Sequence, residues 1–267
     1  MYFMEKLKEN QIFSLCSRAK KLASYEPSEE VNAFFSELCQ FVSGQIDYEL
    51  DFDPIFVSDE VKDLQQVCAV AEGEMEKFWS KKIQFAQDPQ KMLKSFIYYQ
   101  NYEDLTGLEY ALLASQNAGF GKALFVGSWA LPLTAIILAQ NWWVCSVLIE
   151  RDEVAVELSR GLVQALGLED KITIKKTDFL VYFEDDSHYD AVILASLLFT
   201  SGDTEELVTH LVKNIKFKNC LVRTVRGMRQ LLYKKVDEKL LEKYLKPELL
   251  VDPQNHILNS ILLYSHV

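Results

Sequence analysis

The stretch from Ala123 to Ile149 contains no charged residue, and this limits what the chain can fold into. It is longer than the roughly 20 apolar residues that a membrane-spanning helix needs. However, Gly127, Pro132 and Gln140-Asn141 divide it into pieces too short to cross a bilayer. Buried parallel strands are also continuous apolar runs, so the stretch predicts a strand, a turn, a helix and a second strand.

The same alternation continues to the end of the chain. Strands of a parallel sheet are joined by helices of 10 to 15 residues, so this pattern predicts βαβ units with helices on both faces. The expected strands are Lys122 to Gly127, Trp143 to Glu150, Ile172 to Lys175, Tyr189 to Ala195, Cys220 to Thr224 and Ile257 to Tyr264. The expected helices are Leu131 to Gln140, Glu153 to Leu166 and Thr204 to Asn214.

The residues before this region have the periodicity of helices almost throughout. Apolar side chains recur at helical spacing after Ser28, which is expected to cap one helix, and from Ser58 to about Gln87. We therefore predict a helical domain over residues 1–118 and a doubly wound α/β domain over residues 119–267. Ligands of open α/β sheets bind at the carboxyl ends of the strands, so the helical domain is expected to roof the site.

Composition excludes several classes of function. With 28 Lys+Arg against 39 Asp+Glu the formal net charge is −11, which disfavours nucleic acid as a partner. Five scattered cysteines without a CxxC pair are typical of a reducing compartment, and no apolar leader opens the sequence, so we expect a cytoplasmic protein. The histidines have no metal-binding spacing, and no metal site is expected.

Three residues at the expected strand ends describe a nucleoside pocket. Gly127 lets a ligand approach the backbone in the turn after the first strand. Glu150, at the end of the second strand, can accept hydrogen bonds from a ribose diol, and Asp178, after the third, can accept one from an adenine amino group. No GxGxxG or Walker motif accompanies them. The set fits S-adenosylmethionine as a co-substrate.

Several longer segments of the sequence resemble the nicotianamine synthases and their bacterial relatives that make opine-type metallophores. The similarity covers most of the chain and is specific in the AEG, YYxNY and VGSxxxPLT elements. The matching segments are PSEEVNAFFSEL, DEVKDLQQVCAVAEGEMEKFW, FIYYQNYEDLTGLEYALL, FVGSWALPLTAIILA, KTDFL, YDAVILASL, LVRTVRGMRQLLY and LNSILL. Trp129 departs from the pattern, because the plant enzymes have a glycine there; its side chain must stack on the ligand or swing away.

The resemblance implies a methyltransferase-like fold that does not transfer methyl. In that family an acceptor amine attacks the γ-carbon of the methionine portion, which passes on 2-aminobutanoate and leaves methylthioadenosine. The amine must lose a proton, so a base is needed. Glu72 matches the family's catalytic glutamate and Tyr98 a tyrosine near the same amine, whereas Glu74 and Glu76 are expected to be solvated.

The resemblance and the strand ends together give the expected site. The residues expected to bind the co-substrate are Gly127, Ser128, Pro132, Leu133, Thr134, Glu150, Asp178, Phe179 and Ala195. The residues expected to bind the small amino-acid acceptor are Tyr98, Asn101, Tyr102 and Arg223. Arg223 is expected to form bidentate hydrogen bonds to a carboxylate. Arg226 and Arg229 are expected on the surface of a following helix.

Three functions are compatible with the sequence. Aminobutanoyl transfer can yield nicotianamine, built from repeated donor units, or a shorter compound made on another amino acid such as histidine. Ordinary methyl transfer would share the α/β domain but leave AEGEME and YYQNY unexplained. A non-catalytic binding protein is disfavoured because Glu72 and Tyr98 are both present.

Overall fold

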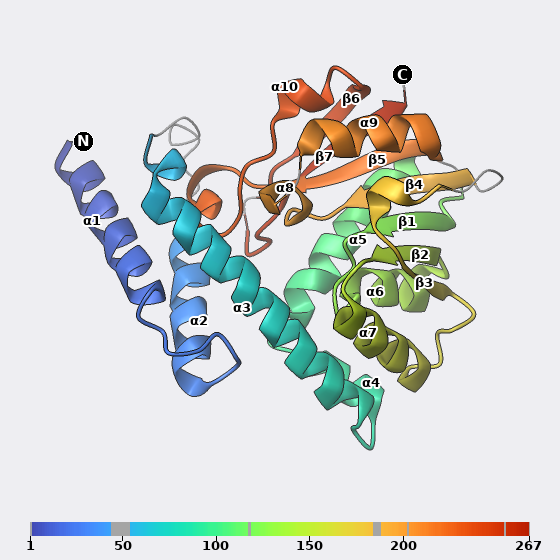
Figure 1. Cartoon of the computed structure of the whole chain (residues 1–267), viewed down its shortest axis with the longest axis horizontal. Coiled ribbons are helices and arrows are strands. Elements are labelled where there is room, and N and C mark those ends of the chain that lie inside the picture. The colour runs from blue at the N-terminus through green and yellow to red at the C-terminus, as the bar shows by residue number, and fades with distance from the viewer. Residues whose placement is uncertain are drawn as a thin grey trace.

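The protein is built around one seven-stranded sheet with the strand order β3-β2-β1-β4-β5-β7-β6 (Figure 1). The structure, a computed structural model, describes residues 2–43, 54–116, 119–183, 188–201, 203–253 and 255–266. The strands are β1 (Lys122–Val126), β2 (Cys145–Glu150), β3 (Ile172–Lys176), β4 (His188–Leu194), β5 (Lys216–Thr224), β6 (Leu245–Val251) and β7 (Ser260–His266).

The first five strands run parallel, as the alternation of strands and helices predicts. At the far edge β7 pairs antiparallel with both β5 and β6. The sequence predicts β7 but not β6. Most of the β6 side chains are exposed, and Pro247 lies within the strand, so the segment lacks the apolar pattern of a buried strand.

Helices precede the sheet and connect its strands. They are α1 (Tyr2–Ala19), α2 (Glu29–Ser43), α3 (Asp59–Gln84), α4 (Pro89–Lys94), α5 (Tyr99–Gln116), α6 (Leu133–Trp142), α7 (Glu153–Ala165), α8 (Leu198–Ser201), α9 (Thr204–Asn214) and α10 (Glu238–Leu241). Single 3₁₀ turns are η2 (Pro54–Val57), η3 (Phe179–Val181) and η4 (Gly227–Leu231). No helix among the described residues is long and apolar enough to span a membrane.

Side-chain caps explain where the N-terminal helices begin. Ser28 accepts a hydrogen bond from the Val31 N–H at 3.2 Å, and Ser58 accepts one from the Val61 N–H at 3.3 Å. Both caps lie where the sequence predicts helix starts. The second of these helices, α3, ends three residues earlier than the expected Gln87, because Asp88 caps the short helix α4 through the Lys91 N–H.

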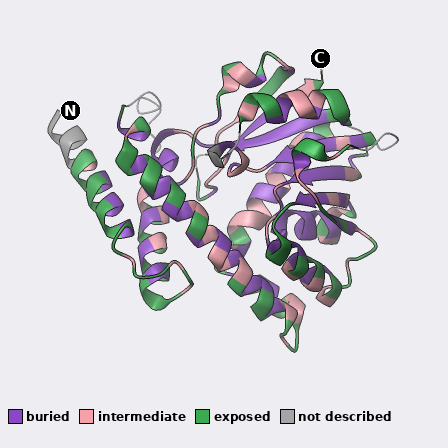
Figure 2. Ribbon diagram, viewed as in Figure 1, coloured by how far each residue is buried: buried purple, intermediate pink, exposed green. Residues whose placement is uncertain are grey.

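Alternate side chains of the strands enter two different cores. In β1, Ala123 and Phe125 belong to a cluster that contains α4, α5, α6 and α7 residues, whereas Leu124 and Val126 belong to a second cluster with α9. This period of two is the geometry of a strand buried on both faces. Figure 2 shows the resulting buried sheet between layers of helices that are exposed on their outer sides.

A third core cluster joins α1, α2 and the first half of α3 to η4, the turn that follows β5. The second half of α3 and the whole of α5 instead contribute to the sheet's own core, through residues such as Ile83, Leu105 and Leu113. The described N-terminal helices therefore lie over the sheet's carboxyl edge by way of α3 (Figure 1). The division into two domains at residue 118 stays a prediction.

Candidate functional site

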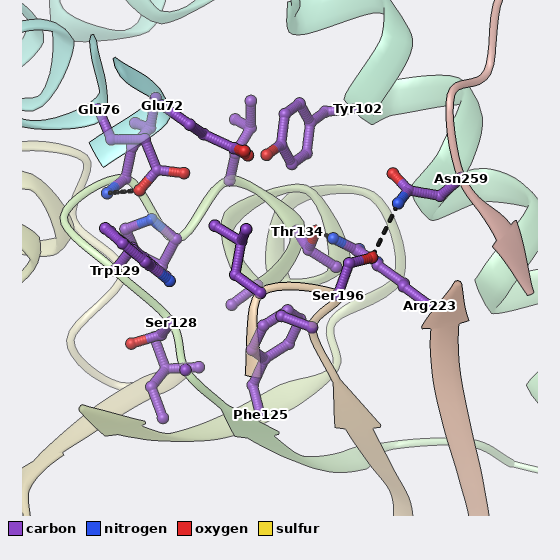
Figure 3. Close-up of a pocket in the computed structure, with 18 of the residues that line it drawn as sticks. Glu72, Glu76, Tyr102, Phe125, Ser128, Trp129, Thr134, Ser196, Arg223 and Asn259 are labelled. Carbon is purple, nitrogen blue, oxygen red and sulfur yellow. Dashed lines mark hydrogen bonds between the residues drawn. The ribbon is translucent and has the colours of Figure 1, made fainter. Parts of the chain in front are cut away.

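Three adjoining cavities lie where α3 and α5 meet the carboxyl ends of the strands. The central cavity, about 570 Å³ with part open to solvent, is lined from both sides, by Glu72 and Tyr102 and by Ser128, Thr134 and Arg223 (Figure 3). The outer cavity is lined by the ends of β1, β2 and β3, and the helical cavity by α2, α3 and α5. Gly127, Trp129 and Leu197 line both the central and the outer cavity. Glu72, Tyr102, Tyr233 and Asn259 line both the central and the helical cavity.

The structure distributes the expected co-substrate residues over two of these cavities. Gly127, Glu150, Asp178 and Phe179 line the outer cavity. Gly127 also lines the central cavity, together with Ser128, Pro132, Leu133, Thr134 and Ala195. All nine residues thus lie along one path at the carboxyl edge, and their ligand contacts stay predictions.

The turn after β1 adopts an unusual backbone. Gly127 has a φ of +75° and Trp129 a φ of +54°, the left-handed region that glycine tolerates and tryptophan rarely adopts. Glu150 stabilises this turn: its Oε2 accepts from the Trp129 N–H at 2.9 Å. Its Oε1 accepts from the N–H groups of Arg151 and Asp152, both at 2.8 Å. The carboxylate expected to bind ribose therefore also shapes the turn, a role that the sequence analysis missed.

Asp178 has local partners besides its place in the outer cavity. Its Oδ1 accepts from the Leu180 N–H at 2.9 Å and caps η3, and its Oδ2 lies 3.7 Å from the Arg151 guanidinium. Its side chain remains half exposed. The neighbouring Phe179 is buried and packs edge-on against His210.

Glu72 lies at the junction of the central and helical cavities. The Tyr233 hydroxyl donates to its Oε2 at 3.0 Å, and Tyr102 is a second hydrogen-bond partner. Loss of water around the carboxyl raises its pKa, although both tyrosines and the charge of Arg223 oppose the rise. Burial therefore favours the protonated form of this carboxyl more than water does.

Glu76 was expected to be solvated, and this is wrong. It is buried one helical turn after Glu72, on the same face of α3, and lines the central cavity. Its Oε2 accepts from the Leu131 N–H at 3.2 Å, and Ala130 supplies a second backbone hydrogen bond. Burial, with the charge of Glu72, raises its pKa well above the ordinary value. The spacing of four residues from Glu72 was the available signal, because such residues share one face of a helix. Glu74 instead pairs with Lys77 at 3.0 Å.

The YYQNY segment contributes mainly to the helical cavity. Tyr98 and Asn101 line only that cavity among the three, whereas Tyr102 also reaches the central one. The Tyr98 hydroxyl is 4.0 Å from the Cys39 Sγ, and burial raises the pKa of this tyrosine, so it is a neutral hydroxyl. Asn101 donates to the His256 carbonyl at 2.7 Å.

Arg223 does not offer two parallel N–H groups to a substrate carboxylate, as was expected. Its Nε and Nη2 donate to the two carboxylate oxygens of Glu109 at 2.6 and 2.8 Å, and Nη2 also donates to Thr134 at 2.7 Å. The paired face of the guanidinium is therefore occupied within the protein. Arg223 still lines the central cavity, where Figure 3 shows it opposite Glu72 and Glu76.

Arg226 and Arg229 were expected on the surface, and this too is wrong. Arg226 pairs with Glu238 at 2.6 Å, and Arg229, which is only 2% exposed, pairs with Asp252 and donates to the Pro253 carbonyl. The chain after β5 does not form an exposed helix. It folds back as η4 against α2 and α3, which buries Arg229 and leaves Arg226 partly buried.

Tyr233 and Asn259 are site residues that the sequence analysis missed. Tyr233 follows η4, and Asn259, just before β7, donates to the Ser196 Oγ at 3.0 Å across the cavity (Figure 3). Both residues belong to segments that carry the family resemblance, which was the only signal available. The described residues contain no group of three side chains suited to hold a metal ion.

Comparisons with known proteins agree with this arrangement. A family model described as "Nicotianamine synthase protein" matches residues 5–267. The chain is 30% identical to nicotianamine synthase 1 of Arabidopsis thaliana over 268 residues, which are 95% of this chain and 82% of the relative. It is also 30% identical to nicotianamine synthase 3 of Oryza sativa subsp. indica over 275 residues, 97% of this chain and 78% of the relative.

Solved structures show the same fold. The crystal structure of MtNAS in complex with MTA and tNA superposes with a TM-score of 0.84 at 21% identity, covering 97% of this chain and 98% of that one. The crystal structure of a mutant of MtNAS in complex with S-adenosylmethionine superposes with a TM-score of 0.82, covering 96% of this chain and 97% of that one. The predicted fold class, a doubly wound methyltransferase-like sheet preceded by helices, is confirmed.

Proposed function

Because the chain belongs to the nicotianamine synthase family, we propose that it transfers 2-aminobutanoate from S-adenosylmethionine to an acceptor amine and releases methylthioadenosine. S-adenosylmethionine is the substrate that supplies the transferred unit. Adenosine occupies the outer cavity, beside Glu150 and Asp178. The methionine portion lies in the central cavity, and the acceptor enters through the helical cavity.

One observation carries the proposal. Glu72, Tyr102, Tyr233 and Asn259 line both the central and the helical cavity, so a ligand in each would meet at these side chains. An acceptor of the methyl group would have to approach the sulfonium itself, at the boundary between the outer and the central cavity. Here the acceptor space opens towards α3 and α5, where the amino-acid arm of the donor ends, which favours attack on that arm.

The chemistry requires one new bond, one broken bond and one proton transfer. The acceptor nitrogen bonds to the γ-carbon while the bond from that carbon to sulfur breaks, and its electron pair stays on sulfur. The ammonium proton of the acceptor goes to a carboxylate. Glu72 and Glu76 both line the central cavity, and burial raises the pKa of each, which makes a carboxylate a stronger proton acceptor. We assign the proton transfer to this pair.

The acceptor is a small amino acid or a second donor-derived unit. The family relationship favours the latter, and thus nicotianamine as the product. The alternative acceptor is histidine, as in the synthesis of opine-type metallophores. Ordinary methyl transfer is the second candidate function.

Identification of the nucleoside product tests the proposal. Purified protein incubated with S-adenosylmethionine should release methylthioadenosine, together with products heavier by aminobutanoate units. Turnover without added amino acid supports nicotianamine synthesis, whereas a strict requirement for histidine supports the alternative. S-adenosylhomocysteine as the main nucleoside would refute aminobutanoyl transfer and establish methyl transfer.

A further inference from the structure

Trp129 lies at the boundary between the outer and the central cavity. Of the three residues that line both cavities, Gly127, Trp129 and Leu197, it alone has an aromatic side chain. In Figure 3 it lies beside Glu76, on the wall opposite Arg223. Any ligand that extends from one cavity to the other must pass this residue.

The position of the indole is fixed from two sides. Its backbone N–H is bound by Glu150, which holds the strained turn in place. Its six-membered ring lies against Gly73 of α3, where an added Cβ would come within 2.6 Å of Cζ3 and 3.3 Å of Cε3. The glycine of the AEG segment therefore forms the notch in α3 that accommodates this ring.

The proposed function places a definite chemical group at this boundary. In S-adenosylmethionine the sulfonium joins the ribose to the amino-acid arm, so it lies between the outer and the central cavity. Aromatic rings attract cations through their π face, and tryptophan does so most strongly. We propose that Trp129 is a specificity-determining residue that recognises the sulfonium charge and discriminates the charged donor from neutral thioethers. This inference rests on the proposed function.

The reaction itself removes the recognised charge. When the carbon–sulfur bond breaks, the electron pair remains on sulfur, and the sulfonium becomes the neutral thioether of methylthioadenosine. The attraction to the indole is lost at the same moment. The protein therefore holds its donor more tightly than its nucleoside product, which assists product release.

A matched pair of ligands isolates this effect. S-adenosylmethionine and S-adenosylhomocysteine share the nucleoside and the amino-acid arm but differ in the charge on sulfur. The quantity measured by calorimetry is the Kd for S-adenosylhomocysteine divided by that for S-adenosylmethionine. We expect Trp129→Leu to lower this ratio by roughly 3- to 30-fold and Trp129→Phe to lower it less.

Two further variants show whether a change in the ratio comes from loss of the indole contact or from misfolding of the turn after β1. Trp129→Gly removes the ring and suits the positive φ, so it keeps the turn and should lower the ratio as Trp129→Leu does. Gly73→Ala leaves the ring present but displaces it from its notch, and should also lower the ratio. Trp143→Leu is the control, because Trp143 also has a positive φ, is 74% exposed and lines none of the three cavities.

An analogue of S-adenosylhomocysteine with a secondary ammonium in place of its sulfur carries a charge but no methyl group, and so separates the effect of charge from that of methyl size. Its preference over S-adenosylhomocysteine should fall in the Trp129 variants in parallel with that of the donor. An unchanged ratio in both Trp129→Leu and Trp129→Gly, with donor binding intact, would overturn the inference and leave the proposed function standing. A wild-type protein that does not bind S-adenosylmethionine would overturn both.

Discussion

Glu109 and Arg223 form a two-bond ion pair inside the protein, although 114 residues separate them in the sequence. The Nε and Nη2 atoms of Arg223 lie 2.6 and 2.8 Å from the Oε1 and Oε2 atoms of Glu109. Both side chains are almost fully buried. The pair joins α5 to the end of β5 at the wall of the central cavity. Burial of either charge alone would be unfavourable, so the two residues depend on each other.

Breaking this pair should destabilise the protein strongly. Glu109→Ala leaves the Arg223 guanidinium buried without its paired carboxylate, and we expect the free energy of unfolding to fall by about 3–5 kcal/mol. Urea denaturation measures it. The exposed pair of Arg18 and Glu37 is the control, because Glu37→Ala should cost no more than about 1 kcal/mol. Equal costs at the two sites would contradict the structural role of Glu109.

Removing a carboxylate from the central cavity should reduce turnover. An amide cannot accept the ammonium proton, so Glu72→Gln and Glu76→Gln should each lower kcat by roughly 10²- to 10⁴-fold while the donor still binds. Release of methylthioadenosine is the measurement. Glu74→Gln lies on the same helix but outside the three cavities and should keep its turnover. Wild-type rates in both cavity variants would exclude this pair as the base.

The same carboxylates should make stability and activity depend on pH in opposite directions. Burial raises the pKa of Glu72 and of Glu76 above 4.5, so the folded protein binds these protons more tightly than the unfolded chain does. The stabilisation that comes from tighter proton binding by Glu72 and Glu76 in the folded state is therefore fully present below about pH 4.5. It is lost as the pH rises through their folded-state pKa values. Activity should rise over that interval, because the base must be ionised.

Glu76→Gln should remove much of this pH dependence. We expect the difference in free energy of unfolding between the variant and the wild type to grow in favour of the variant as the pH rises from 4.5. Thermal or urea unfolding at several pH values measures it. A difference that does not change with pH would mean that the carboxyl of Glu76 titrates normally in the folded protein.

Asp178→Ala should weaken binding of S-adenosylmethionine. Loss of a hydrogen bond to a charged acceptor costs about 1.5–3 kcal/mol, or roughly ten- to a hundredfold in Kd. Calorimetry with the donor measures the change. Asp237→Ala is a matched control, because Asp237 also caps a short helix, through the Leu240 N–H, but lines none of the three cavities. Equal donor affinity in the wild type and Asp178→Ala would place the adenine elsewhere.

The sequence by itself determined the framework of the sheet and one edge of the site. A parallel strand that is buried on both faces is a short apolar run, and such runs form β1 and β2. Parallel strands end at the same edge of a sheet, so Gly127, Glu150 and Asp178 had to gather there once the strands were recognised. The edge strand β6 lacked the pattern and escaped prediction.

Only the tertiary structure decided which charges meet and which side chains are buried. The sequence predicted that Arg223 would bind a substrate carboxylate. Packing of α5 against the sheet instead supplies Glu109 as its partner. Glu76 shares a helix face with Glu72, but its burial depends on the turn after β1, which covers it, whereas Glu74 on another face pairs with Lys77. Local periodicity follows from bond geometry, whereas partners far apart in the chain depend on how whole elements pack.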